Sequence, residues 1–180
     1  MKNRIDAAID VAIIAGSGSD IPVINETAKI LENFGLSYSL NIASAHRSAE
    51  HLKQCVKNAE SSGAKVFIAA AGMAAALPGV IASKTSLPVI GVPMESKNLA
   101  SMDALFAIVQ MPKGVPVACV AVGKAGAVNA AVLAAQIIAV SNDGLKEKLA
   151  QYRKEQAKSV IKEDLKLQNG IEKYMEGIKK

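Results

Sequence analysis

The sequence contains few aromatic, sulfur-containing or imidazole side chains. Its 180 residues include no Trp, two Cys and two His, and aromatic residues make up 3% of the chain. Cys55 and Cys119 lie far apart in apolar stretches, which favours buried, reduced thiols over a disulfide or a metal site. Because the two histidines are the only other strong nitrogen or sulfur ligands, we expect no bound metal ion.

Long apolar runs are also missing. The longest, residues 125–140, is interrupted by Asn129 and Gln136, and it falls short of the roughly 20 apolar residues that a membrane-spanning helix needs. The first ten residues have neither the apolar stretch nor the cleavage site of an export signal. We therefore expect no membrane segment and a cytoplasmic location.

The charge is only moderately biased. The formal net charge is +5, and residues 146–180 carry ten Lys or Arg against six Asp or Glu, so most of the excess lies in this tail. Charges of mixed sign along a helix are typical of a solvent-exposed face rather than a nucleic-acid site. We expect no binding to nucleic acid.

Apolar residues make up 51% of the chain and recur in five runs of strand length. These runs cover residues 11–15, 38–43, 66–71, 88–92 and 115–122, with segments of helix length between them. Continuous apolar strands indicate a sheet covered on both faces, and alternation with helices indicates parallel strands. We predict an α/β fold, a three-layer αβα sandwich around a parallel five-stranded sheet with flavodoxin-like order.

A single domain, residues 1–180, accounts for this pattern, with a core over about 11–141 and a helical tail over about 143–180. Asp20 is expected to cap a helix that begins near Pro22, and Gly35 to end it. The tail is polar, and its apolar residues are too sparse for a core. We expect it to form one or two helices that pack on the body or on a neighbouring subunit.

The segment 124–140 has small apolar residues nearly all round its predicted helix. A helix that is apolar all round must be buried all round. Since one sheet covers only one side, we predict that the other side contacts a second subunit and that the protein is a homo-oligomer.

Two polar loops follow the first two predicted strands. The first reads Gly16-Ser17-Gly18-Ser19-Asp20 and the second Ser44-Ala45-His46-Arg47. The carboxyl ends of parallel strands meet in one crevice, so the loops can share a site with phosphate donors, a carboxylate and a titratable imidazole. A tight turn capped by Asp20 would explain the first loop alone, and His46 alone would be read as structural, so the prediction depends on both loops.

Three further segments complete the pattern. Residues 71–79 read Ala-Gly-Met-Ala-Ala-Ala-Leu-Pro-Gly after the third strand, residues 93–96 follow the fourth, and residues 110–117 form a proline-framed turn. Together with the Gly-Lys-Ala-Gly-Ala start of the helix at 123, the motifs over about 11–152 resemble the N5-carboxyaminoimidazole ribonucleotide mutase family of purine biosynthesis. Several motifs in this order are far more specific than any one of them.

The resemblance implies a flavodoxin-like subunit in a homo-octamer, a small ribonucleotide substrate, and no metal or organic cofactor. It implies transfer of a carboxylate from the exocyclic nitrogen to ring carbon C4, through release and recapture of carbon dioxide. His46 is then the general acid/base, Asp20 holds the ribose, and Ser17, Ser44 and Arg47 bind the phosphate. The remaining expected substrate-binding residues are Ser19, Gly72, Met73, Ala76 and Leu77.

The sequence departs from the mutase pattern inside the expected site. Met73 and Ala76 replace a glycine and a histidine, Ser101 replaces a glycine, and Glu95 stands where a neutral or basic residue is common. Ala76 is similar to the branch that carboxylates aminoimidazole ribonucleotide directly. Two alternatives to the mutase therefore stay open: direct carboxylation, and a paralogue that binds a related nucleotide without this catalysis.

Overall fold

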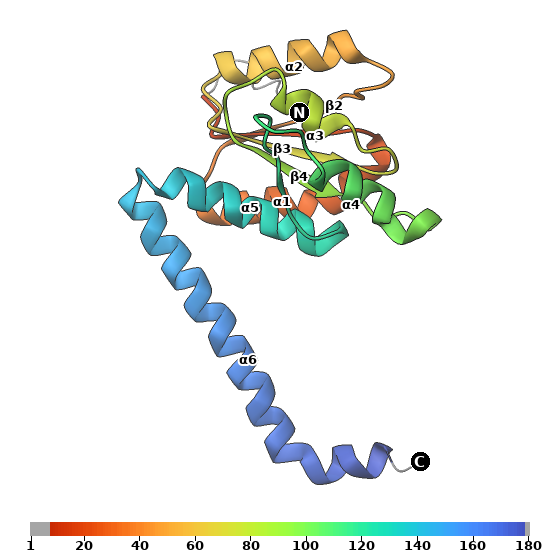
Figure 1. Cartoon of the computed structure of the whole chain (residues 1–180). Coiled ribbons are helices and arrows are strands. Elements are labelled where there is room, and N and C mark those ends of the chain that lie inside the picture. Colours follow the sequence, from red (N-terminus) through yellow and green to blue (C-terminus); the bar gives the residue numbers. More distant parts are fainter. Residues whose placement is uncertain (1–7, 179–180) are drawn as a thin grey trace.

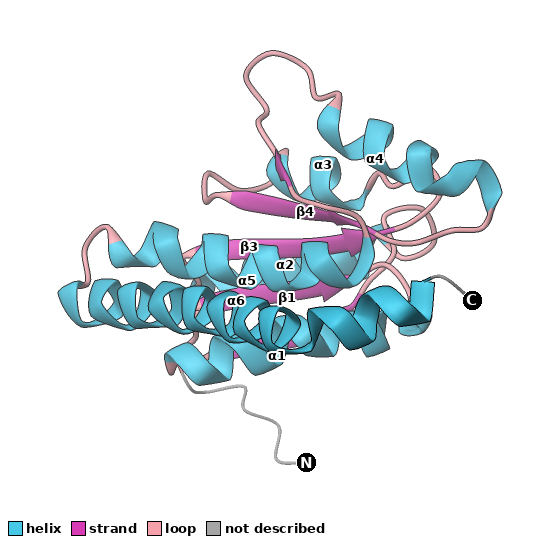
Figure 2. Cartoon of the chain, turned by 90° about the horizontal axis from the view of Figure 1, so that it is seen from below, coloured by secondary structure: helices cyan, strands magenta, loops and turns pink. Residues whose placement is uncertain are grey.

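Five parallel strands form one sheet in the order β2-β1-β3-β4-β5, and Figure 2 shows its central strands β1, β3 and β4 side by side. The computed structural model describes residues 8–178, without the side chains of residues 98, 169 and 172–178. The strands are β1 (Val11–Ala15), β2 (Tyr38–Ile42), β3 (Val66–Ala71), β4 (Val89–Pro93) and β5 (Ala118–Cys119). This is the flavodoxin-like strand order, as predicted.

Helices cover both faces of the sheet (Figure 1). They are α1 (Ile21–Phe34), α2 (Ala49–Ser61), α3 (Leu77–Ala82), α4 (Met102–Val109), α5 (Gly123–Ala139) and α6 (Asp143–Ile178), with short 3₁₀ turns at Gly18–Asp20 and Asn98–Ser101. One apolar cluster joins the sheet to α1, α5 and the start of α6, and another joins it to α2, α3 and α4. The predicted three-layer sandwich is confirmed.

The three central strands are buried along their whole length. Successive side chains of a strand point to opposite faces, so Ile13 and Ile68 enter one apolar cluster while Ile14 and Phe67 enter the other. All four side chains are no more than 1% exposed. Burial of this kind contributes about 1.5–3 kcal/mol to the stability of the fold for each large apolar side chain. The buried strands hold in place the sheet edge from which the polar loops extend.

The edge strands differ from the sequence prediction. A strand was predicted over residues 115–122, but β5 covers only Ala118 and Cys119. Pro116 has no amide proton for a ladder, and β5 pairs with β4 alone. At the other edge, Asn41 and Ile42 of β2 are exposed, so this strand is not covered on both faces as its neighbours are.

The start of α1 also differs in detail from the prediction. Asp20 does occupy the position before the helix, and Pro22 lies in its first turn, but the Asp20 side chain makes no capping hydrogen bond to α1. Its Oδ2 instead accepts a hydrogen bond from the Ser17 amide at 3.1 Å. Gly35 ends α1 as predicted, with the left-handed φ of +73° that glycine adopts without strain.

The subunit contact predicted at α5 stays a prediction, and the small residues of this helix do not by themselves require it. Its small residues, such as Ala127, Ala131 and Ala135, are buried within one chain by the sheet, α1 and α6. The Thr27 hydroxyl of α1 donates to the Ala127 carbonyl at 2.8 Å, which shows how closely small side chains allow α1 to approach. Ala125, at the exposed start of α5, is an exception.

The tail is a single helix, and its first turns belong to the core. Leu145 and Leu149 are buried, and the ring of Tyr152 packs edge-on against Phe34 with centroids 5.4 Å apart. The expectation that the tail has no core residues was therefore wrong for its first three turns. Val160 and Ile161 are exposed. No helix in residues 8–178 combines the length and apolar character needed to cross a bilayer.

Candidate active site

The loop after β1 folds back on itself through its own hydroxyls and carboxylate. The Ser19 hydroxyl donates to the Ser17 hydroxyl at 2.9 Å, and the Asp20 carboxylate accepts from the Ser17 amide. This reciprocal capping box at the 3₁₀ turn holds both serines beside the end of β1. The loop therefore offers hydroxyl groups to a ligand, while the Ser17 amide is already bonded to Asp20.

Asp20 is a buried carboxylate, 9% exposed. Burial raises its pKa above the ordinary value of 3.8, and the hydrogen bonds from the Ser17 amide and the Ser19 hydroxyl offset part of this rise. A carboxylate in this position is a strong acceptor for sugar hydroxyls, because its remaining lone pairs face a partly desolvated space.

The loop after β2 places His46 and Arg47 next to the first loop. The Ser44 hydroxyl accepts from the Arg47 amide at 3.2 Å and from its Nε at 3.4 Å, and the Arg47 Nη2 donates to the Gly16 carbonyl at 3.4 Å. The guanidinium thus bridges the loops after β1 and β2. His46 and Arg47 are both exposed, so a ligand can reach them.

The loop after β3 contains a strained residue. Met73 has a φ of +57°, in the left-handed region that favours glycine, and its side chain is 64% exposed. Ala76 directly precedes α3, and Leu77 is buried as its first residue. At Gly72, an added Cβ would lie 3.4 Å from the Cβ of Met94, directly after β4, an ordinary van der Waals contact.

The loop after β4 brings a second carboxylate to the site. Glu95 lies directly over Gly123, so a Cβ on that glycine would overlap the Glu95 carboxylate. The Ser101 hydroxyl accepts from the Ser96 amide at 2.8 Å and donates to the Ser96 carbonyl at 3.2 Å. These two hydrogen bonds join the two ends of the segment 96–101. Ser101 itself has a left-handed φ of +65°.

All four loops line one cavity of about 590 Å³. It includes every residue proposed from the sequence: His46, Ser17, Ser19, Asp20, Ser44, Arg47, Gly72, Met73, Ala76 and Leu77. Met94, Glu95 and Ser96 also line the cavity; the sequence places Glu95 inside the expected site without a binding role, and it does not predict Met94 and Ser96 there. Their position directly after β4 was the available signal, since strand ends converge at the switch point between β1 and β3.

Groups outside the cavity do not extend this chemistry. Cys55 and Cys119 are free thiols whose pKa is raised by burial. The other histidine, His51, is exposed on α2 with its Nε2 3.6 Å from the Cys55 Sγ. Within residues 8–178, no group of three or more His, Cys, Asp or Glu is arranged to hold a metal ion.

The strand order and this polar cavity define a flavodoxin-like α/β protein with a ligand site at the carboxyl edge of its sheet. Comparison with known proteins narrows the assignment. Residues 10–159 match the family model described as AIR carboxylase, and the chain belongs to that family.

Several relatives are similar over most of their length. The N5-carboxyaminoimidazole ribonucleotide mutase of Pyrococcus horikoshii is 49% identical, over 92% of this chain and 93% of its own. The mutase of the same name from Thermotoga maritima is 45% identical, over 92% and 96%. The crystal structure of Treponema denticola PurE superposes with a TM-score of 0.80 at 32% identity, covering 87% of this chain and 97% of that one.

Proposed function

We propose that this chain is an isomerase that converts N5-carboxyaminoimidazole ribonucleotide into 4-carboxyaminoimidazole ribonucleotide in purine biosynthesis. One observation carries the proposal: His46, Asp20 and Arg47 converge on a single cavity at the carboxyl edge of the sheet. The mutase names of relatives 45–49% identical to this chain support it.

Substrate binding is divided among the loops. Arg47, with its planar guanidinium, and the hydroxyls of Ser17 and Ser44 receive the phosphate. Asp20 accepts hydrogen bonds from the ribose hydroxyls, and the Ser19 hydroxyl adds a further polar contact. This arrangement leaves the aminoimidazole ring of the substrate between His46 and the loop after β3.

The loop after β3 encloses the reacting end of the substrate. Gly72 and Leu77 shape its backbone, while Met73 and Ala76 line the cavity. Carbon dioxide released in the first step must stay near the ring until it is recaptured. The cavity therefore increases the reaction rate by positioning the reactants and excluding water. The reaction needs an acid/base group but no metal or organic cofactor.

His46 carries the proton in both steps. In the first, the bond between the exocyclic nitrogen and its carboxylate breaks, carbon dioxide leaves, and the imidazolium gives its proton to that nitrogen. In the second, C4 of the ring attacks carbon dioxide, and the neutral imidazole takes the proton that C4 loses. Atoms and charge balance without a co-reactant, and general acid/base catalysis of this kind contributes about 10²–10⁴-fold in rate.

Direct carboxylation of aminoimidazole ribonucleotide is the second candidate, and Ala76 favours it. This residue lines the cavity at a position where the mutase pattern has a histidine, so the site has one titratable imidazole rather than two. The direct reaction uses the second step alone, with carbon dioxide taken from solution.

Assembly and location complete the proposal. We expect a homo-octamer, following the family resemblance, and a cytoplasmic location, where purine biosynthesis supplies the ribonucleotide. Light scattering tests the octamer, because it measures the mass of the particle in solution, which should be eight times the mass of one chain.

An ultraviolet assay of the purified protein tests the reaction. It follows the C4-carboxylated product from N5-carboxyaminoimidazole ribonucleotide and, separately, from aminoimidazole ribonucleotide with carbon dioxide. Turnover of the first substrate is the expected result. Turnover of only the second would assign the protein to direct carboxylation, and no turnover of either would favour a paralogue without this catalysis.

A further inference from the structure

Helix α6 extends past the end of the family model, and its outer half projects from the body (Figure 1). The family model ends at residue 159, whereas the helix runs to Ile178. Figure 1 shows α6 projecting away from the body, so within residues 8–178 no other part of the chain covers its outer half. Val160, Leu167 and Ile171 are 66%, 43% and 43% exposed there.

One line of residues along α6 repeats with alternating spacings of four and three. It consists of Lys146, Ala150, Arg153, Ala157, Val160, Asp164, Leu167 and Ile171, all of them exposed. This is the a/d spacing of a two-stranded coiled coil. We call this line the α6 seam. Its small residues lie in the half near the body, and its large apolar residues lie in the outer half.

The α6 seam is complementary to itself in the antiparallel direction. With the two-fold axis between residues 158 and 159, Arg153 faces the partner's Asp164, Ala150 faces the partner's Leu167, and Ala157 faces the partner's Val160. Each alanine thus receives a larger apolar side chain, and the opposite charges meet twice. Every pair matches an a position with a d position, as an antiparallel coiled coil requires.

A parallel pairing has neither advantage. In that register, Arg153 would meet the partner's Arg153, and Asp164 would meet the partner's Asp164. Like charges in direct opposition are unfavourable. Charge and side-chain size therefore both select the antiparallel arrangement.

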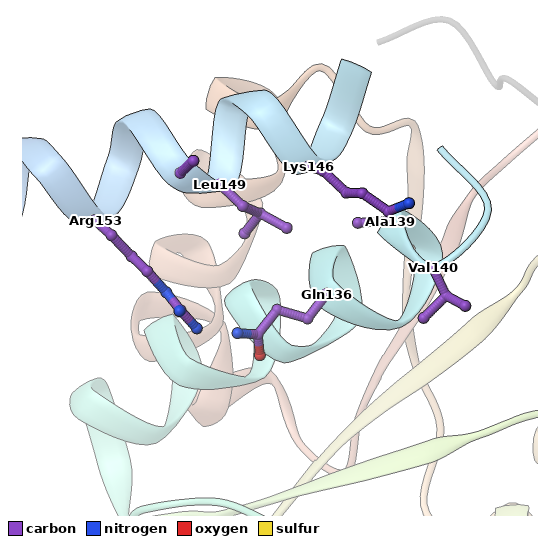
Figure 3. Close-up of a pocket in the computed structure, with 7 residues that line it drawn as sticks. Gln136, Ala139, Val140, Lys146, Leu149 and Arg153 are labelled. Carbon is purple, nitrogen blue, oxygen red and sulfur yellow. The ribbon is translucent and has the colours of Figure 1, made fainter. Parts of the chain in front are cut away.

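The body provides a groove beside the near half of the α6 seam. A cavity of about 490 Å³ lies between α5 and α6, lined by Gln136, Ala139, Val140, Lys146, Leu149, Ala150 and Arg153. In Figure 3, Leu149 and Val140 give this cavity apolar walls, and Arg153 and Lys146 extend from α6 at its two ends. The partner's Leu167, placed opposite Ala150, reaches this space, and the partner's Ile171 follows beside Lys146.

We propose that α6 pairs with α6 of a second copy as an antiparallel coiled coil, each outer half covering the groove between α5 and α6 of its partner. This contact buries the exposed apolar side chains of the α6 seam, Val160, Leu167 and Ile171. It does not depend on the reaction proposed above.

Cysteine cross-linking in the full chain tests the pairing. We expect Ala150→Cys/Leu167→Cys to form covalent dimers on mild oxidation, seen on a denaturing gel without reductant. The two new thiols of one chain are about 25 Å apart at 1.5 Å of rise per residue, so they cannot bridge each other. The matched control is Ala150→Cys/Leu165→Cys, since Leu165 is 56% exposed but lies outside the α6 seam.

The pairing predicts at least a tenfold higher dimer yield for the first variant than for the control. Adding Arg153→Asp to the first variant should lower the yield several-fold, and adding Asp164→Arg as well should restore it, because the charges are then exchanged. Equal yields in both cysteine variants, or no rescue by the exchange, would overturn the proposal.

Discussion

Met73 combines backbone strain with a position in the cavity. Its φ of +57° costs a non-glycine residue about 1–2 kcal/mol. We predict that Met73→Gly raises the free energy of unfolding by up to about 1 kcal/mol, since the entropy of glycine in the unfolded chain offsets part of the gain. It should also tighten nucleotide binding, because a long side chain leaves the cavity.

Met73→Ala separates these two effects. Alanine shortens the side chain but keeps the left-handed strain, so it should tighten binding without the gain in stability. Urea denaturation and a nucleotide titration measure the two quantities. If Met73→Gly proves less stable than the wild type, the strain is not released at this residue.

The raised pKa of Asp20 predicts how the stability of the protein changes with pH, and burial of the carboxylate sets the sign of that change. Its pKa in the folded protein is raised, so the ionised carboxylate destabilises the fold. That penalty is absent below the unfolded value of 3.8 and complete above the folded pKa. We therefore expect the stability of Asp20→Asn relative to the wild type to increase as the pH rises from 3 to 7. Denaturant unfolding at a series of pH values measures it, and a relative stability that falls with pH would contradict the sign.

Glu95 brings negative charge to the cavity in which we propose that the substrate carboxylate binds. A charge pair at about 4 Å in water is worth about 1 kcal/mol, so Glu95→Gln should lower the KM for N5-carboxyaminoimidazole ribonucleotide several-fold. The affinity for aminoimidazole ribonucleotide, which lacks that carboxylate, is the control and should change less. An equal change for both ligands would show that Glu95 acts through the loop rather than through its charge.

At the level of elements, the base of α6 is held by its buried leucines. Leu149→Ala should cost about 2–3 kcal/mol of unfolding free energy, because it opens a cavity between α6 and the α1–α5 layer. Leu165→Ala, at an exposed position of the same helix, should cost less than about 0.5 kcal/mol. Urea midpoints of the two variants compare these costs directly, and similar losses would mean that α6 is not anchored at Leu149.

The elements that the sequence predicted best are those whose burial is complete. β1 and β3 have the predicted bounds because both faces of each strand are covered and the apolar run marks its ends. β5 is shorter than predicted because a proline and an open edge limit its ladder. The sequence alone does not decide what covers α5, since an apolar helix can be buried by its own chain or by a neighbour, and the pattern is the same in both cases.

At the level of the whole molecule, the strand-end rule located the site. Ser17, His46 and Gly72 come from three separate loops, and parallel topology alone predicts that these loops meet. The contacts that shape the cavity could not be predicted in this way. The bridge from Arg47 to the Gly16 carbonyl and the position of Glu95 over Gly123 depend on how the side chains pack in three dimensions.

We propose His46, one of the two histidines of the chain, as the proton carrier in this cavity, and paired variants of the two histidines test that role. Turnover of N5-carboxyaminoimidazole ribonucleotide should fall at least about 100-fold in His46→Asn, with the oligomer unchanged. His51→Asn, which alters the exposed histidine of α2, should keep nearly wild-type turnover. Near-wild-type turnover in His46→Asn would show that this histidine does not carry the proton.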